Sequence, residues 1–329
     1  MPIRRMRVCL VSTIARVGAS PIGREDVERA AAAIAGRLHR TPTFSARSLG
    51  DGLYLKAELF QRTGSFKPRG VLTKLGSLGE AERAAGVISV SAGNHAQALA
   101  WGAAGLGVDA LLVMWKDADP AKVAATRAYG AEVDLEADGP ADAFRRLHRL
   151  QEETGRTFVP PYDDPFVLAG QGTVGLEILE DVPGVDTVVV PVGGGGLVGG
   201  ITAACVPSGV RVVAVEPEGS RALQAGLAAG RSVPVETASF AQALNAPFAG
   251  ELPIAICRAL GVEVVVVGDE EIAEAFRLLY GRAKLACEPG GAAAVAAVLT
   301  GRVDGGTTVC VVSGGNVAGP IAAGILAVP

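Results

Sequence analysis

The stretch TVVVPVGGGGLVGG, residues 187–200, decides the fold class of this 329-residue chain. Residues 187–192 are valine-rich and uncharged, which is typical of a parallel strand buried on both faces. Four glycines follow at once, and the small residues after them predict a helix. A strand that turns through glycines into a helix is the repeating unit of α/β proteins, so this stretch predicts a parallel sheet with crossover helices.

The same alternation of strand and helix continues on both sides of this stretch. Runs rich in valine, isoleucine or leucine predict strands at 52–60, 87–91, 109–114, 131–136, 210–216, 262–267 and 307–312. Apolar residues at helical spacing predict helices at 25–38, at 94–105, from Pro120 and from Asp269. In the last helix, Ile272, Phe276 and Leu279 form the apolar stripe.

Length and composition limit the number of domains and the classes of function. A chain that is 49% hydrophobic over 329 residues is long and apolar enough for two domains, or for one large domain with an insertion. Residues 151–165 are the expected crossing between lobes. A formal net charge of −4, without a basic stripe carrying aromatic residues, argues against nucleic-acid binding. The apolar runs are too short to span a membrane.

The five cysteines are isolated, odd in number and embedded in apolar runs. This pattern predicts buried free thiols in a reducing compartment, which favours the cytoplasm, and it predicts neither disulfides nor a zinc site. Residues 1–21 weakly resemble a signal peptide, but their apolar run is only about eight residues long. We therefore expect a disordered extension or an over-extended start there.

The glycine run allows two functional interpretations. Backbone amides of Gly193–Gly196 converge at a predicted helix N-terminus, which is the arrangement that binds phosphate. However, Gly194, Gly196 and Gly199 also satisfy G-x-G-x-x-G, and Glu216 closes the next strand where a ribose-binding acid would stand. That second interpretation predicts an NAD-dependent dehydrogenase, and it leaves other polar loops unexplained.

Three further polar segments lie at expected strand-to-helix turns or helix starts. SAGNHAQ (91–97) suits a carboxylate ligand, and Ser313 in SGGN (313–316) can bond to a ring nitrogen. Glu288 in EPGGAAA (288–294) opens a predicted helix, where an acid is favoured by the helix dipole. Each could also be an ordinary cap or turn. Together they predict a ligand site, because open α/β sheets bind ligands at the carboxyl ends of their strands.

Lys67, in TGSFKPRG (63–70), would be an ordinary surface lysine if it stood alone. With phosphate-binding amides, a carboxylate-binding loop and a partner for a ring nitrogen, it completes the requirements of one particular ligand. That ligand carries a phosphate, a pyridine ring and an aldehyde that condenses with an amine, which describes pyridoxal 5'-phosphate.

These motifs resemble the fold-type II pyridoxal-phosphate enzymes, specifically the threonine and serine dehydratase group that includes serine racemase. The resemblance runs from about residue 22 to residue 325 and also rests on HRTP (39–42), YDDP (162–165), GQGT (170–173) and VEP (215–217). It implies a two-lobed α/β fold like that of the tryptophan synthase β subunit, in which each lobe is a mostly parallel sheet flanked by helices. It places a large cofactor-binding domain in residues 1–85 and 163–329, and a small mobile domain in residues 86–162.

The resemblance also implies a role for each motif residue. Lys67 would condense with the cofactor aldehyde and act as the catalytic base. The other implied cofactor-binding residues are Phe66 on the ring, Asn94 at the ring hydroxyl, Gly193, Gly194, Gly195, Gly196 and the Leu197 amide at the phosphate, Ser313 at the ring nitrogen, and Glu288. The implied substrate-binding residues are Ser91, Gly93, Asn94 and His95.

The implied reaction is β-elimination from a β-hydroxy amino acid, by default L-threonine or L-serine, giving a 2-oxo acid and ammonia. Ala92 stands where racemases of this group carry a serine that protonates the opposite face, so a lyase is favoured over a racemase. A β-replacement enzyme and an inactive cofactor-binding protein remain alternatives. The group's divalent-cation site would use Glu216 and Ser220, but its third ligand is replaced by Ala222, which makes that site doubtful.

Two further departures concern specificity and regulation. Trp115-Lys116 and Gln242–Asn245 replace segments usual in the group, which indicates either neutral drift or a changed substrate pocket. The chain ends soon after SGGN, so we expect no C-terminal regulatory domain. By resemblance, we expect a homodimer or homotetramer.

Overall fold

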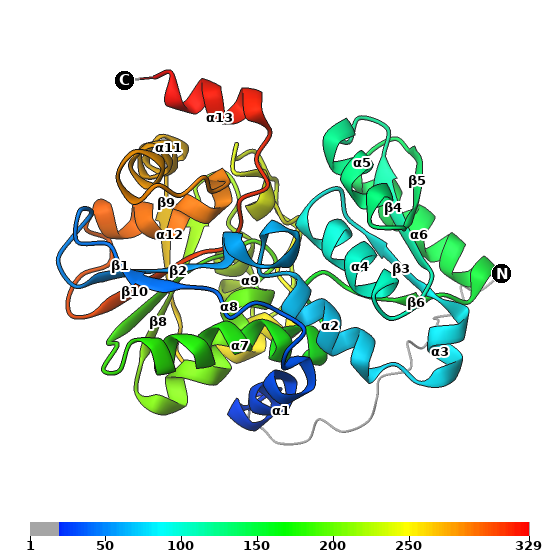
Figure 1. The fold of residues 1–329 in the computed structure, drawn as a ribbon, viewed down its shortest axis with the longest axis horizontal. Helices are drawn as coiled ribbons and strands as arrows, with labels where there is room; N and C mark the ends of the chain where they lie inside the picture. The colour runs from blue at the N-terminus through cyan, green and yellow to red at the C-terminus, as the bar shows by residue number, and fades with distance from the viewer. Residues whose placement is uncertain (1–19, 329) are drawn as a thin grey trace.

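The computed structural model describes residues 20–328 as two sheets of unequal size, each covered by helices (Figure 1). The expectations for residues 1–19, including Cys9, lie outside the described residues. No helix within 20–328 combines the length and the apolar character that crossing a membrane requires.

The larger sheet has the strand order β1-β2-β10-β7-β8-β9. Its first pair is antiparallel and all its other pairs are parallel. The bounds of its strands are β1 Thr43–Ser45, β2 Leu53–Ala57, β7 Thr187–Pro191, β8 Arg211–Pro217, β9 Glu263–Val267 and β10 Thr308–Val312. The helices of this lobe are α1 Arg24–Ile34, α2 Pro68–Ser77, α7 Pro165–Asp181, α8 Gly196–Cys205, α9 Ala222–Ala229, α10 Glu251–Ala259, α11 Asp269–Leu278, α12 Pro289–Leu299 and α13 Gly319–Leu326.

The smaller sheet is wholly parallel, with the order β5-β4-β3-β6. The bounds of its strands are β3 Val87–Val90, β4 Ala110–Trp115, β5 Glu132–Ala137 and β6 Thr157–Phe158. Four helices accompany it: α3 Glu80–Ala85, α4 Asn94–Ala104, α5 Pro120–Ala128 and α6 Pro140–Thr154. All four strands fall within residues 86–162, the range expected for the small domain.

Strand β7 explains why a valine-rich run becomes a central strand. Val188 and Val190 pack into the core cluster on the side of α1, α7 and α8, whereas Val189 packs into the cluster that contains α11 and α12. Because both faces are buried, the strand shows no polar alternation. The β7–glycine–α8 unit thus sits at the centre of the larger lobe.

The sequence-based expectations are confirmed for every strand listed from 87 onward, to within one or two residues. The strand expected at 52–60 ends at Ala57, because Glu58–Phe60 turns into a 3-10 helix. The short strands β1 and β6 were not predicted, since three and two residues carry no readable period. The chain returns from the smaller sheet between β6 and α7, inside the segment expected to cross.

Candidate active site

Lys67 immediately precedes helix α2, with Pro68 at the first helical position. Proline is tolerated there because that N–H has no acceptor within the helix. The Lys67 Nζ donates a hydrogen bond to the carbonyl oxygen of Pro161 at 2.9 Å, and it lies 5.2 Å from the centre of the Phe66 ring. The amine therefore points toward the segment in which the chain returns from the smaller sheet.

The surroundings of Lys67 favour its neutral form. Burial lowers the pKa of Lys67 from 10.5 to about 8, although the nearby Glu288 carboxylate acts in the opposite direction. A lysine with a pKa close to neutrality can accept a proton at physiological pH, which an ordinary lysine cannot.

The loop before Lys67 is paired with the loop after β10. Phe66 N donates to Ser313 O at 3.1 Å, Gly315 N donates to Gly64 O at 2.9 Å, and Ser65 forms a bridge with Gly314. Ser313, expected at a ring nitrogen, is buried directly beside the lysine loop. The buried hydroxyl of Ser65 has no hydrogen-bond partner among the described residues.

Asn94 and Glu288 come from different lobes and meet beside this loop. Asn94 opens α4 of the smaller lobe, and Glu288 immediately precedes α12 of the larger one. Asn94 Nδ2 donates to Glu288 Oε1 at 2.7 Å. Burial raises the pKa of Glu288 to about 7, against the opposing effects of the Asn94 hydrogen bond and the charges of Lys122 and Lys67.

The other expected residues of the segment 91–95 have surroundings that differ from those of Asn94. The Ser91 hydroxyl accepts a hydrogen bond from Gly93 N at 3.2 Å, which shapes the turn before α4. His95 Nε2 lies 3.1 Å from Ser89 Oγ and 3.0 Å from Val159 O, so its ring fastens α4 to the smaller sheet. Burial, together with the charge of Lys67, lowers the pKa of His95 to about 3, so the ring is neutral. Direct contact between His95 and a substrate stays a prediction.

The glycine loop carries consecutive amides without acceptors within residues 20–328, just before α8. The N–H groups of Gly193, Gly194 and Gly195 donate to none of the described residues, and Gly195 adopts φ +91°. Gly196 and the buried Leu197 form the first turn of the helix, where N–H groups lack intrahelical acceptors. Amides gathered in this way suit a phosphate.

Two residues that were not named among the expected site residues lie against this loop. A Cβ at Gly194 would overlap the ring of Tyr162, and a Cβ at Gly193 would lie 3.2 Å from Leu244 Cα. Leu244 also lies against Gly290, two residues after Glu288. Tyr162 belongs to the YDDP motif and Leu244 to the atypical Gln242–Asn245 segment, but nothing in their spacing revealed these contacts.

Several of the expected site residues are thus joined in a closed ring of contacts. Lys67 bonds to Pro161, and the adjacent Tyr162 packs on the glycine loop. Leu244 connects that loop to Gly290 beside Glu288, and Asn94 and Asn316 connect Glu288 to Thr63 in the lysine loop. The ring contains both free amides and a lysine whose pKa is close to neutrality. Together these groups suit a ligand that carries a phosphate and an aldehyde.

A buried ionic network holds Arg69 in the first turn of α2. The Arg69 guanidinium bonds to both oxygens of Glu58 at 2.8 Å, and to the two oxygens of Glu177 at 2.7 and 2.9 Å. Lys56 adds a pair with Glu177 at 2.7 Å. Because every charge has an opposite partner, the network can stay buried and fix the start of the lysine helix.

Glu216 does not lie in the ring of contacts. Its two carboxylate oxygens accept hydrogen bonds from Leu223 N and Gln224 N in the first turn of α9, at 2.7 and 2.9 Å. The Ser220 hydroxyl donates to Leu244 O at 3.0 Å. Within residues 20–328, no group of three His, Cys, Asp or Glu side chains could hold a metal ion. Glu216 caps a helix here, so the geometry does not support the dinucleotide interpretation.

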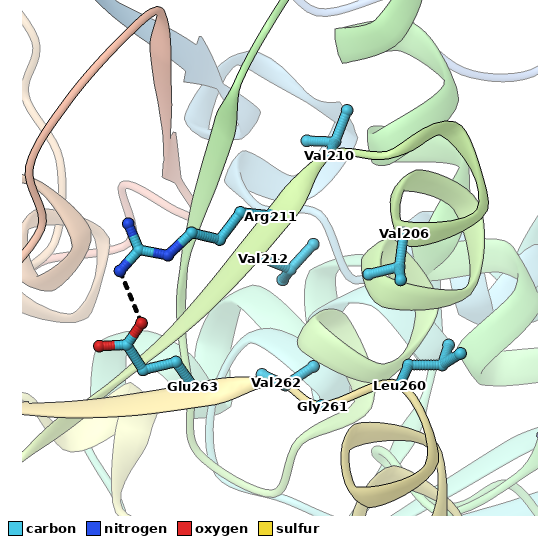
Figure 2. Close-up of a pocket in the computed structure, with 8 residues that line it drawn as sticks. All are labelled: Val206, Val210, Arg211, Val212, Leu260, Gly261, Val262 and Glu263. Carbon is cyan, nitrogen blue, oxygen red and sulfur yellow. Dashed lines mark hydrogen bonds and ion pairs between the residues drawn. The ribbon is translucent and has the colours of Figure 1, made fainter.

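The pocket in Figure 2 is a separate feature at the opposite end of the larger sheet. It is lined where β8 and β9 begin, by residues that include Val210, Val212 and Leu260, with an Arg211–Glu263 ion pair at 2.6 Å across the two strands. Ligands of parallel sheets bind at the carboxyl ends of the strands. This pocket faces the other end and carries none of the expected site residues.

Comparison with known proteins shows what the chain is similar to. The sequence model of the family described as "Pyridoxal-phosphate dependent enzyme" matches residues 34–314. The catabolic L-threonine dehydratase TdcB of Escherichia coli (strain K12) is 41% identical over 309 residues, covering 90% of this chain and 94% of that protein.

Solved structures of similar fold come from the same kinds of enzyme. The T.th. threonine deaminase is 40% identical with a TM-score of 0.83, and the match covers 90% of this chain and 99% of that one. The maize serine racemase is 34% identical with a TM-score of 0.86, covering 91% and 95% of the two chains. Both lyases and racemases therefore share this two-lobed fold.

Proposed function

We propose, from the premise that this chain belongs to the pyridoxal-phosphate dependent enzyme family, that it is an ammonia-lyase acting on a β-hydroxy amino acid. The observation that carries the proposal is Lys67, an amine with a pKa of about 8, held in a ring of contacts with a loop of free amides. The proposed reaction needs a base and a phosphate-binding loop in one site, and this arrangement supports that requirement.

The residues present fit the cofactor. The amides of Gly193–Gly196 and Leu197 would hold the phosphate, Phe66 would lie on the ring, and Ser313 would face the ring nitrogen. Asn94 and Glu288 would complete the polar side. When bound, pyridoxal phosphate supplies an aldehyde for amines and a ring that takes up the electron pair left at the α-carbon.

The chain itself supplies binding and proton transfer. Lys67 Nζ, in its neutral form, accepts the proton of the substrate α-carbon. The turn of Ser91, Gly93 and Asn94, with its exposed amides, would hold the substrate carboxylate. Loss of the α-proton and of the β-hydroxyl removes one water, and subsequent hydrolysis releases ammonia and leaves a 2-oxo acid.

We favour a lyase over a racemase because of Ala92. A racemase needs a proton donor on the face opposite Lys67, and the methyl group of Ala92 cannot give or take a proton. The maize serine racemase shares the fold, so racemisation remains the second candidate. Chiral analysis of the amino acid that remains after reaction of a pure L substrate separates the two. A racemase forms the D enantiomer, whereas a lyase does not.

The substrate we propose is L-threonine or L-serine. Support comes from the names of relatives, which include L-threonine dehydratase and L-threonine ammonia-lyase. A panel of β-hydroxy amino acids, scored for 2-oxo acid formation with the purified holoenzyme, tests this directly. If no β-hydroxy amino acid yields a 2-oxo acid while another amino acid does, the proposed substrate class is wrong.

We further propose a homodimer or homotetramer in the cytoplasm, with residues 86–162 moving as a small domain. The four described cysteines are free and buried, which supports a reducing compartment. The resemblance to the dehydratase group supports the assembly. Light scattering after gel filtration measures the assembly, and a monomer would contradict it.

A further inference from the structure

The side chain of Asn316 bridges two loops of the candidate site. Its Nδ2 donates to the carbonyl oxygen of Thr63 at 2.7 Å and to Asn94 Oδ1 at 2.8 Å. Asn94 in turn donates from its own Nδ2 to Glu288 Oε1 at 2.7 Å. The chain Thr63–Asn316–Asn94–Glu288 therefore runs from the lysine loop to the start of α12.

The direction of this chain is fixed at one end. A backbone carbonyl can only accept, so the Thr63 oxygen requires the NH2 group of Asn316 to face it. The second N–H of that same group then points at Asn94, which must present its oxygen. Asn94 is left to present its NH2 group to Glu288, whose carboxylate oxygen accepts. The orientation of Asn94 thus follows from the Thr63 carbonyl.

The Thr63 carbonyl is itself held in an unusual place. Thr63 has φ +59°, a conformation that is rare for a β-branched residue. Its hydroxyl is buried without a partner among the described residues. Backbone strain of this kind persists only where the surroundings enforce it, and Asn316 and the Gly315–Gly64 hydrogen bond supply two such contacts.

We infer that Asn316 is a positioning residue that sets the orientation of the Asn94 amide and ties the smaller lobe to the lysine loop. Asn94 belongs to α4 of the smaller lobe, whereas Asn316 and Glu288 belong to the larger lobe. Asn316 acts through Asn94, and the inference therefore rests on the proposed place of Asn94 beside the cofactor.

The test compares two substitutions of Asn316 by their affinity for pyridoxal phosphate, measured by equilibrium dialysis of cofactor-free protein. Asn316→Ala removes both donated hydrogen bonds, and we expect binding to weaken about tenfold. Asn316→Asp keeps the shape but places an acceptor against two acceptors. We expect it to bind at least as weakly as the alanine variant at pH 8. Its affinity should recover in part toward pH 5, because the protonated carboxyl can donate one of the two hydrogen bonds.

If Asn316 acted through packing alone, the two variants would show the opposite order of affinity for pyridoxal phosphate. If Asn316 only fills space, the isosteric Asn316→Asp variant binds like the wild type and more tightly than Asn316→Ala at both pH values, which would overturn the inference. Glu288 and Lys67 also titrate near this site, so the wild type and Asn316→Ala are measured over the same pH range. Far-UV circular dichroism and thermal melts confirm that each variant is folded.

A double variant separates this inference from the proposed function. In an Asn94→Ala background, Asn316→Ala should weaken binding less than about threefold, because its route to the cofactor is already lost. Full additivity of the two effects would contradict action through Asn94. If Asn94→Ala alone leaves the affinity unchanged, the proposed place of Asn94 is wrong, whereas the role of Lys67 is tested independently by its own substitution.

Discussion

Lys67 Nζ and the carbonyl oxygen of Pro161 are joined by a hydrogen bond of 2.9 Å. Pro161 lies between β6 and α7, where the chain returns from the smaller sheet, and the next residue, Tyr162, packs on Gly194. Two consecutive residues therefore span from the amine to the amides expected to bind phosphate. The spacing of the site is thus set by the crossing segment as well as by the larger sheet.

The contact between Tyr162 and Gly194 makes the glycine loop sensitive to a single methyl group. In Gly194→Ala the new Cβ would overlap the Tyr162 ring, so the loop or the tyrosine must shift. We expect the affinity for pyridoxal phosphate to fall at least about a hundredfold, in line with a loss of about 3 kcal/mol. Equilibrium dialysis measures this.

Gly76→Ala is the matched control, because a Cβ at Gly76 meets nothing within 4 Å. Gly76 lies in α2, so this control also samples the lysine helix. Equal losses in the two variants would show that the loop does not hold the phosphate.

The lowered pKa of Lys67 predicts unusual reactivity of the cofactor-free protein. The unprotonated amine is the reactive form, so acylation of Lys67 should rise with pH to a half-maximum near pH 8 rather than 10.5. Mass spectrometry of peptides, after brief exposure to an amine-acylating reagent at each pH, gives the profile. The exposed Lys116 in the same digests serves as the internal reference, and a shared midpoint for the two lysines would contradict the prediction.

Glu288 predicts a pH dependence of stability. Its pKa is raised in the folded state to about 7 from 4.5, so its contribution to stability is fully present below pH 4.5 and is lost as the pH rises through 7. Relative to Glu288→Gln, which cannot ionise, the wild type should lose about 1–3 kcal/mol of unfolding free energy over that range. Urea unfolding at pH 5 and pH 8 measures it, and a difference that does not change with pH would refute the assignment.

From the Arg69 network we expect a large loss of stability when one charged partner is removed. Arg69→Met leaves Glu58, which is fully buried, without its cation, and we expect a loss of about 3–5 kcal/mol in unfolding free energy. Replacing Glu58 with Gln in the same chain should restore part of that loss, because the unpaired charge is gone. Denaturant unfolding of the single and double variants measures their free energies of unfolding. A double variant less stable than Arg69→Met would contradict the expected effect of the unpaired charge.

The sequence predicted the sheets well because their central strands are buried on both faces. In β7 and β10 every residue after the first threonine is apolar, and in β8 the only charged residues are Arg211 and Glu216 near its two ends. Each strand leads to a glycine-rich or polar turn. Such runs are easily recognised, and the carboxyl-end rule then places their loops together. The grouping of Lys67, Asn94, Glu288 and the glycine loop followed from that rule and the resemblance.

What the sequence could not predict are contacts between side chains that are distant along the chain. Asn316 follows a predicted strand and could have been any polar turn residue. One of its two hydrogen bonds goes to the carbonyl of Thr63, whose φ of +59° is unusual, and the other goes to Asn94 in the smaller lobe. Likewise, Glu216 ends a strand as a ribose-binding acid would, yet its carboxylate caps α9. Local spacing does not determine where such a side chain turns.

The central claim is that Lys67 binds pyridoxal phosphate and removes the α-proton of a β-hydroxy amino acid. The most direct measurement is the visible absorption band of the purified holoprotein, with 2-oxo acid formation from L-threonine and L-serine followed in the same samples. We expect the wild type to show both and Lys67→Ala to lack the band and to lose at least about a thousandfold in rate. A Lys67→Ala protein that keeps the band and the activity would contradict the account.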